Sequence, residues 1–482
     1  MIKERANVTK GLALVLTCSC WLLASLVMKR DLFILVAVLG AFFTGFHAAA
    51  ADSKPNVIFI LADDLGYGDI GCFGQKLIQT PNLDRLAREG MRFTQSYAGT
   101  TVCAPSRCAL MTGKHTGHCF VRGNKEIKPE GQEPMPADTF TVAHLMKRAG
   151  YATGIVGKWG LGKPDSTSTP DKMGFDYFFG YNCQTKAHEY YPEYLWRNHD
   201  KVMLNGQFYS HDLMAEDALD FVRRNQVKPF FLYLAFTIPH GKFQVPSQEP
   251  YAQENWPPQP KNIAAMISRL DKDIGRLMAL LKELGLDERT LVFFASDNGA
   301  GYPPQFFQSS GPLRGMKRDL YEGGLRSPSL ARWPGKIKAG VVSEQVWAFW
   351  DFLPTMAELT GQKPPPDMDG LSILPALLRG KALEHPPLYF EFHERGFTQA
   401  ARLGDWKAVR LGTKKPIELY DLKTDLGEAH DVAAQHPEVV KHIEEYLKTA
   451  RVDSEIWPIR ENGAKKAVGK KGQQKTPASP GE

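Results

Sequence analysis

The sequence predicts an α/β protein with a large, mostly parallel sheet flanked by helices, followed by a small antiparallel sheet with one helix. Three observations lead to this prediction. Short apolar runs of strand length recur along most of the chain, and helical stretches separate them. After about residue 387 the pattern changes to short strand-like runs in succession. Apolar runs without alternation are typical of strands buried on both faces, and strands joined by helices indicate a parallel sheet covered on both sides.

The first predicted strand is the apolar run Asn56–Ala62. A helix is expected over 80–90, because this stretch begins with threonine and proline and ends with glycine, which are favoured at those positions. Residues 139–148 repeat this plan, and 152–156 form the next strand. The order strand, helix, helix, strand fits a sheet whose neighbours are joined by helical crossovers.

The second half of the large domain continues the alternation. Residues 212–225 and 264–284 have helical periodicity, whereas 230–238 and 290–295 are apolar runs that predict buried strands. In the last part of the chain, strands are predicted over 388–393, 399–403, 406–411 and 418–420, and a helix over 437–451.

A chain of 482 residues is long for a single core, so a large domain and a smaller one are expected. We predict an export-signal region over 1–51, a large N-terminal domain over 52–386 and a small α+β subdomain over 387–460. The remainder, 461–482, is rich in lysine, glycine, glutamine and proline and is expected to be a disordered basic tail.

The first 51 residues contain two apolar runs divided by a charged triplet at 29–31. Starting at Met28, they have the charged start, apolar core and small-residue cleavage site of a signal peptide, with cleavage after Ala50 or Ala51. The other reading is a two-helix membrane anchor, but the first run is barely long enough to span a bilayer. We therefore expect a periplasmic or secreted protein with no stable membrane insertion after cleavage.

The net charge of +6 is concentrated at the ends of the chain. Subtracting the surplus of three positive charges in 1–50 and of four in 464–482 leaves −1 for the rest. A basic face for nucleic acid is therefore not expected. The cysteines beyond the signal region are Cys72, Cys103, Cys108, Cys119 and Cys183. An odd number in an exported protein implies at least one unpaired thiol, and no pairing can be assigned from sequence.

The stretch 103–107 reads Cys-Ala-Pro-Ser-Arg, and its last two residues begin a predicted helix over 106–111. A nucleophile at the entry of a helix faces free backbone N–H groups and the positive end of the helix dipole, which suits attack on an anionic ester. Arg107 lies one turn further on, where it could hold both the nucleophile and an anion. By itself the stretch fits a buried free cysteine before an ordinary helix better than a catalytic nucleophile.

Two predicted strands end in pairs of oxygen ligands. Asp63 and Asp64 follow the first strand, and Asp297 and Asn298 follow the strand over 290–295. In an open α/β sheet, ligand sites form beyond the carboxyl ends of the strands. Three carboxylates and an amide suit a hard divalent cation, and Ca²⁺ accepts such a shell more readily than Mg²⁺, which usually keeps more water.

The pattern Cys-x-Pro-x-Arg, together with these acidic pairs, resembles the type I sulfatases of the alkaline phosphatase superfamily, and in particular bacterial arylsulfatase A-like enzymes. The resemblance covers about residues 54–446 and makes 52–386 the catalytic domain. It implies that Cys103 is oxidised to formylglycine by a formylglycine-generating enzyme. It further implies that Asp63, Asp64, Asp297 and Asn298, with Cys103, hold a calcium ion.

Three more segments match this family. Lys158 lies in a Gly-Lys-Trp-Gly-Leu-Gly stretch after a strand, His240 follows Pro239, and Lys317 follows Gly-Met. The resemblance implies that Lys158, His240 and Lys317 contact the sulfate, with Arg107 close by. His240 or Lys317 would then donate the proton to the departing alcohol.

One position departs from the family pattern. Where the family often has a histidine that is hydrogen-bonded to the formylglycine hydrate, this chain has Gly160. The proton handling assigned to that histidine must be absent, taken by water or supplied elsewhere. His115, His118 and His188 are the candidates to replace it, although each is more often a structural or substrate-facing residue.

The resemblance implies an exported sulfatase that hydrolyses aryl or carbohydrate sulfate monoesters, so the expected partner is a sulfated small molecule or glycan. One alternative is a phosphodiesterase or phosphonate monoester hydrolase of the same superfamily. Such relatives tend to bind a transition metal through more aspartate and histidine ligands, whereas the predicted ligands here are oxygen atoms. The other alternative is a non-catalytic binder of sulfated glycans in which Cys103 is never converted.

Overall fold

The computed structural model describes residues 54–460 of the chain. The predicted signal region over 1–51 and the predicted tail over 461–482 lie outside the described residues. From Pro55 onward the described chain belongs to one compact unit. Within it, no helix combines the length and the apolar character needed to cross a bilayer.

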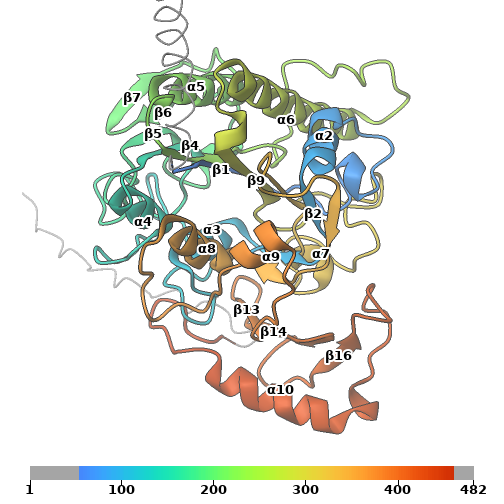
Figure 1. The fold of residues 1–482 in the computed structure, drawn as a ribbon. Helices are drawn as coiled ribbons and strands as arrows, with labels where there is room; N and C mark the ends of the chain where they lie inside the picture. Colours follow the sequence, from blue (N-terminus) through green and yellow to red (C-terminus); the bar gives the residue numbers. More distant parts are fainter. Residues whose placement is uncertain (1–53, 461–482) are drawn as a thin grey trace, which may run out of the picture. The chain divides into compact units, whose positions relative to one another are not determined.

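A ten-stranded mixed sheet forms the centre of the described part, in the order β11-β2-β10-β9-β1-β8-β4-β5-β6-β7 (Figure 1). Its strands are β1 (Asn56–Ala62), β2 (Met91–Phe93), β4 (Ala152–Lys158), β5 (Tyr177–Tyr181), β6 (Tyr194–Arg197), β7 (Asp200–Met203), β8 (Phe230–Ala235), β9 (Thr290–Ser296), β10 (Ser329–Arg332) and β11 (Val341–Ser343). The five central strands, from β9 to β5, are parallel. Antiparallel pairs extend the sheet at both sides, and the outermost strand β11 pairs with β2 in parallel, so the sheet is mostly parallel, as predicted.

Helices cover both faces of this sheet (Figure 1). Ile58 and Ile60 of β1 pack with α2 (Pro81–Glu89), α5 (Ser210–Asn225) and α6 (Pro258–Glu283). Val57, Phe59 and Leu61 pack on the other face with α3 (Cys103–Thr112), α4 (Val142–Arg148), α8 (Phe352–Thr360) and α9 (Leu374–Arg379). Successive strand residues point to opposite faces, so an uninterrupted apolar run is what a strand between two helical layers requires.

The small antiparallel sheet is present as predicted. It contains β13 (Leu388–Phe392), β14 (Thr398–Leu403), β15 (Trp406–Arg410) and β16 (Glu418–Asp421) in sequential order, followed by α10 (Pro437–Thr449). One face of this sheet packs against α10. The other face packs with Tyr97 of β3 (Ser96–Tyr97) and with Leu325 of α7 (Glu322–Leu325). β3 itself pairs with β12 (Trp347–Ala348).

Several predicted boundaries were wrong by a few residues. α4 begins at Val142 rather than at residue 139, because the hydroxyl of Thr141 accepts the hydrogen bond of the His144 N–H and caps the helix. α6 begins six residues earlier than predicted, at Pro258, since a proline at the first helical position needs no N–H partner. β8 ends at Ala235. The chain beyond it leaves the sheet, and the Ile238 carbonyl accepts a hydrogen bond from the Asp63 N–H.

Candidate active site at the carboxyl edge of the sheet

The two acidic pairs meet at the edge where β1 and β9 end. These strands are parallel neighbours, so their carboxyl ends lie side by side. The Asp64 N–H donates to Oδ1 of Asp297 at 3.1 Å, and Nδ2 of Asn298 donates to Oδ1 of Asp64 at 2.7 Å. Asp63, Asp64, Asp297 and Asn298 are all buried. The structure therefore brings together the four side chains predicted to supply oxygen ligands from the strand ends.

Cys103 lies against this cluster at the first residue of α3, with Val102 as the extended N-cap residue. The predicted helix start was too late, because the helix includes the cysteine itself. Its Sγ lies 3.3 Å from Oδ1 of Asp63 and 3.5 Å from Nζ of Lys317. Burial, together with the negative charges of Asp297 and Asp63, raises the pKa of the Cys103 thiol well above its usual value. Unmodified Cys103 is therefore a neutral thiol and a weak nucleophile.

Arg107 follows one helical turn later and is fully buried. Its Nε and one terminal nitrogen donate to Oδ2 of Asp297 at 3.1 and 2.8 Å, and the other terminal nitrogen donates to the Lys158 carbonyl at 3.0 Å. Its hydrogen bonds thus hold Asp297 and the end of β4. It contacts the acidic cluster, and no hydrogen bond to Cys103 accompanies these contacts.

The two predicted lysines neutralise the first acidic pair. Nζ of Lys158, at the end of β4, forms a buried ion pair with Oδ2 of Asp63. Nζ of Lys317 lies 2.7 Å from both carboxylate oxygens of Asp64. Burial by itself would raise the pKa of Asp63, but the charge of Lys158 and other nearby cations outweigh it and hold that pKa well below the usual range.

His240 completes the group. Its Nδ1 lies 2.8 Å from the Gly241 carbonyl, which can only accept, so Nδ1 carries the proton. Nε2 then accepts from Nζ of Lys317 at 3.1 Å, and it also lies 3.2 Å from Oδ2 of Asp64. Burial lowers the pKa of His240, although the neighbouring carboxylates oppose this effect. The neutral ring is therefore the form that this arrangement favours.

The cluster fits a hard divalent cation. Within the described chain, ligand atoms of Asp63, Asp64, Cys103 and His240 all lie within 4.8 Å of one another. Oδ1 of Asn298 is buried and lacks a hydrogen-bond partner there, although Nδ2 of the same amide binds Asp64. A buried amide oxygen without a partner is costly unless it meets a cation or water. Burial and the charge of Asp63 also raise the pKa of Asp297 to about 6, which further favours added positive charge.

Comparison with known proteins agrees with this geometry. The family model described as "Sulfatase" matches residues 55–362, and the model described as "N-sulphoglucosamine sulphohydrolase, C-terminal" matches residues 316–453. The chain belongs to the sulfatase family. It is accordingly a sulfuric ester hydrolase.

Among its relatives, this sulfatase is 36% identical to N-acetylgalactosamine-6-sulfatase of the dog (Canis lupus familiaris) over 78% of this chain and 74% of that protein. It is 32% identical to human arylsulfatase A over 84% and 90% of the two chains. The crystal structure of Ps i-CgsB in complex with k-i-k-neocarrahexaose superposes with a TM-score of 0.75 at 29% identity, covering 85% of this chain and 95% of that one.

At Gly160, where the family pattern often has a histidine, another side chain of this sulfatase occupies the space. Gly160 has a φ of +68°, and a Cβ placed there would lie 2.1 Å from Nε2 of Gln184. Gln184 is buried, and its Oε1 has no hydrogen-bond partner in the described chain. Its backbone N–H donates to Oε1 of Gln132 at 2.7 Å. Sequence reasoning missed Gln184, because it lies in no motif and is 24 residues away along the chain.

Of the three replacement histidines, the structure brings only His188 to the site, where its ring stacks on His240. His118 and His115 lie beyond the far end of α3, about 15 Å from Cys103 along a ten-residue helix. They pair with Asp369, at 2.8 Å from Nδ1 of His118 and 3.5 Å from Nε2 of His115. These two histidines are structural neighbours of the small sheet and do not reach the acidic cluster.

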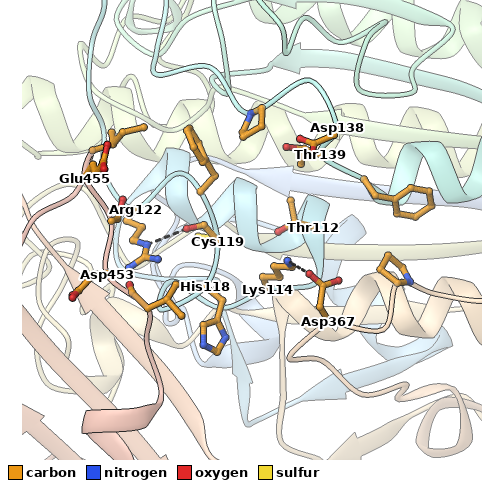
Figure 2. Close-up of a pocket in the computed structure, with 17 residues that line it drawn as sticks. Thr112, Lys114, His118, Cys119, Arg122, Asp138, Thr139, Asp367, Asp453 and Glu455 are labelled. Carbon is orange, nitrogen blue, oxygen red and sulfur yellow. Dashed lines mark hydrogen bonds and ion pairs between the residues drawn. The ribbon is translucent and has the colours of Figure 1, made fainter.

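His118 also lines a cavity of about 580 Å³ at that far end of α3, which Figure 2 shows. The Lys114–Asp367 ion pair and Arg122 line the same cavity. Apart from His118, one of the candidates to replace the family histidine, no predicted site residue of this sulfatase belongs to the cavity lining. The cavity is therefore separate from the candidate active site.

All five cysteines in the described chain are unpaired. Cys103 is the one that lies beside the acidic cluster. Cys108 lies in the same helix but faces Met135, at 3.8 Å between the two sulfur atoms. The site environment thus distinguishes Cys103 from the other buried cysteines of this sulfatase.

Proposed function

We propose that this sulfatase hydrolyses aryl or carbohydrate sulfate monoesters at Cys103, after that residue has been converted to formylglycine. The observation that carries the proposal is the position of Cys103 Sγ between a carboxylate of the acidic cluster and the ammonium of Lys317. A nucleophile placed there has cations beside it for an anionic ester and carboxylates beside it for a metal ion.

The state of the thiol supports conversion. Because burial and nearby carboxylates raise the pKa of Cys103, the thiol would attack a sulfate ester poorly. The hydrate of a formylglycine would supply a hydroxyl nucleophile and a second hydroxyl that a thiol lacks. We therefore propose that a formylglycine-generating enzyme is a maturation partner of this chain.

We propose that Asp63, Asp64, Asp297 and Asn298, with residue 103, hold Ca²⁺ in preference to Mg²⁺. The oxygen-rich donor set and the unpartnered amide oxygen of Asn298 support this choice. When bound, such an ion would polarise a sulfuryl oxygen and offset the charge that develops on it.

The basic side chains then take distinct roles. Lys158 and Lys317 are the ammonium groups paired with Asp63 and Asp64, and we assign them to binding the sulfuryl oxygens. Arg107 holds Asp297 in place. Because His240 accepts a hydrogen bond from Lys317, the proton lies on the lysine, which makes Lys317 the donor to the departing alcohol and His240 its support.

The substrate class and the cellular location are part of the proposal. The relative named N-acetylgalactosamine-6-sulfatase, and the structural neighbour in complex with k-i-k-neocarrahexaose, favour a sulfated sugar over a simple aryl sulfate. The signal-like segment before residue 52 supports a periplasmic or secreted enzyme. We also propose 52–386 as the catalytic domain and 387–460 as a small α+β subdomain. Lys317 belongs to the segment that both family models match.

The second candidate function is hydrolysis of phosphate diesters or phosphonate monoesters. A structure of a phosphonate monoester hydrolase superposes at 20% identity, which shows the shared fold alone. His240 lies within the acidic cluster, and this is the one observation that favours a transition-metal site. In a non-catalytic glycan binder the acidic cluster would be the same, but Cys103 would stay unconverted.

The test compares turnover of 4-nitrophenyl sulfate with that of bis(4-nitrophenyl) phosphate by the purified full chain. We expect the sulfate to be preferred, and Cys103→Ala to lower kcat by a factor on the order of 10⁵ or more. Intact mass should show that residue 103 has lost sulfur and gained oxygen, whereas Cys108→Ser, in the same helix, should keep activity. Sulfatase activity retained in Cys103→Ala, or preference for the diester, would contradict the proposal.

A further inference from the structure

A second imidazole lies against the catalytic group. His188, at the end of the short 3₁₀ helix η2 (Lys186–His188) between β5 and β6, stacks on His240 with ring centroids 4.0 Å apart and planes 13° from parallel. The two residues are 52 positions apart in the chain, so the sheet, and not local sequence, brings them together. His240 in turn contacts Lys317 and Asp64 through Nε2.

The ring nitrogens of His188 are free in the described chain. Neither takes part in a hydrogen bond or an ion pair there, and the stack on His240 is its one ring contact. Its neighbours are engaged: Lys186 lies over the Tyr194 ring, with Nζ 4.1 Å from the centroid, and Glu189 pairs with Lys242 at 3.0 Å. His188 is half-buried, so solvent or a ligand reaches it.

The titratable groups that face His188 are His240, Lys158, Lys317 and Asp63. Burial first, and then the neighbouring basic groups His240, Lys158 and Lys317, lower the pKa of His188 to about 3. At ordinary pH the ring is neutral and offers one N–H donor and one acceptor. Its capacity to form hydrogen bonds is thus constant over the range in which enzymes are assayed.

The position of the pair relative to solvent suggests what His188 contacts. His240 is nearly buried and points Nε2 at Lys317 and Asp64, next to Cys103. The organic part of a bound ester must extend from Cys103 toward solvent, because the opposite side is filled by the buried strands β1 and β9. His188 is the more accessible ring of the stack, because solvent reaches it more than it reaches His240.

We propose that His188 donates a hydrogen bond to the leaving-group oxygen, or to the alcohol portion next to it, and so determines which sulfate esters this enzyme accepts. The inference rests on the proposed sulfate ester hydrolysis and deepens it by naming a substrate-contacting residue. Lys317 supplies the proton, whereas His188 holds the oxygen that receives it, and no proton is transferred to or from His188.

The experiment separates the nitrogen atoms of His188 from its ring stack. His188→Phe keeps an aromatic ring against His240 but removes both nitrogens, and His188→Ala removes both features. Each variant is assayed with 4-nitrophenyl sulfate, whose leaving group is stable as an anion, and with phenyl sulfate, whose leaving group is not. His199→Ala is the matched control, because His199 is an exposed histidine of the same region with a long 3.5 Å pair to Asp171.

The loss of one hydrogen bond of ordinary strength changes a binding constant or a rate constant about tenfold. We expect His188→Phe to lower kcat/KM about tenfold more for phenyl sulfate than for 4-nitrophenyl sulfate, with the same ratio at about pH 5 and pH 9. Calorimetric Kd values for phenyl sulfate, measured in the Cys103→Ala background, should rise by a similar factor, while thermal stability stays near that of the parent.

Equal losses on both substrates would show that His188 only supports His240, and would overturn the inference. Unchanged kinetics and an unchanged Kd would overturn it as well. Failure of the proposed function has a different signature, since the enzyme without any substitution would then hydrolyse neither 4-nitrophenyl sulfate nor phenyl sulfate. The calorimetric arm reports on His188 in that case too, because it needs binding and not turnover.

Discussion

Lys317 donates to both carboxylate oxygens of Asp64 at 2.7 Å, although the two residues are 253 positions apart. The pair belongs to a buried group in which three carboxylates, of Asp63, Asp64 and Asp297, face three cations, of Arg107, Lys158 and Lys317. The group is therefore balanced in charge before any metal or substrate arrives. A divalent cation would add two positive charges, which a sulfate monoester partly offsets.

Removing Lys317 tests this balance. Lys317→Ala leaves the buried Asp64 carboxylate without its main partner, and losing one member of a buried pair typically costs about 3–5 kcal/mol. We expect a loss of that size in the free energy of unfolding in urea without metal, and a smaller loss with Ca²⁺, because the ion replaces the missing positive charge. Loss of proton donation should also lower kcat for phenyl sulfate by about 10²–10⁴.

Lys114→Ala is the control for that substitution. Lys114 pairs with Asp367 at the protein surface, where such a pair contributes at most about 1 kcal/mol. If Lys317→Ala changed stability no more than Lys114→Ala does, the buried charge balance described above would be wrong.

Metal removal gives a second prediction. A chelator should lower the melting temperature of the purified chain, and Ca²⁺ should restore it more fully than Mg²⁺. At a free concentration of about 100 times its Kd, a ligand that binds only the native state adds about 2.7 kcal/mol of stability. Differential scanning calorimetry over a calcium titration measures this gain.

If Ca²⁺ binds at the acidic cluster, the rise in melting temperature with Ca²⁺ should depend on that cluster. Asp297→Ala should abolish the calcium-dependent shift, whereas Asp369→Ala, in the His115–His118 group, should keep it. A shift that persisted in Asp297→Ala would place the ion elsewhere in the molecule.

The packing of Gly160 against Gln184 leads to a third prediction. Gly160→His should destabilise the native state by about 1–2 kcal/mol for a side chain in the left-handed region. Overpacking against Gln184 should add about 1–3 kcal/mol, since the Cβ would lie 2.1 Å from Nε2. Urea unfolding measures both. In the double variant with Gln184→Ala, the overpacking part should disappear, so the two changes are non-additive.

Gly285→His controls for the backbone effect alone. Gly285 has a similar φ of +66°, and no atom lies within 4 Å of the Cβ that would be added. Equal destabilisation by the two histidine substitutions would mean that Gln184 does not fill the space beside Gly160.

A fourth prediction concerns acid stability. Burial would raise the pKa of Glu391, but the hydrogen bond from His393 and the charges of Arg122 and Arg451 outweigh it and lower that pKa to about 2. The folded-state pKa thus lies below the ordinary glutamate pKa of about 4.5. Stability from this residue is complete above about pH 4.5 and is lost as the pH falls toward 2. The loss amounts to about 3 kcal/mol.

Glu391→Gln should therefore flatten the decline of unfolding free energy between about pH 4.5 and 2. Glu444→Gln, an exposed glutamate of α10, should leave the decline as it is. An unchanged slope in Glu391→Gln would mean that the contacts of β13 with Arg122 and Arg451 carry little of the acid sensitivity.

The sequence predicted best where structure depends on local pattern. β1 matches its predicted range, because an apolar run that ends in two aspartates has one clear start and one clear end. The four strands of the small sheet were also found, each within a residue or two. The short edge strands β2, β6, β7, β10 and β11 were not predicted, since runs of three or four residues carry little periodic signal.

For the candidate active site, the sequence motifs indicated which charged side chains take part, but not which of them form ion pairs with each other. Motifs selected the nine residues that lie in or against the acidic cluster, yet no pattern indicated that Lys317 would bind Asp64 while Lys158 binds Asp63. His188 could not be separated from His115 and His118 by sequence, because a histidine in a loop looks the same beside the site and beyond the far end of α3.

The amino-acid sequence by itself thus determined the longer apolar strands, the main helices and the chemical groups available at their ends, because these depend on neighbours a few residues away. Only the tertiary structure decided that Gln184 fills the space beside Gly160 and that His188 stacks on His240. Such contacts depend on the order of strands in the sheet, which joins segments far apart in the chain. That order follows from how all the apolar faces pack together at once.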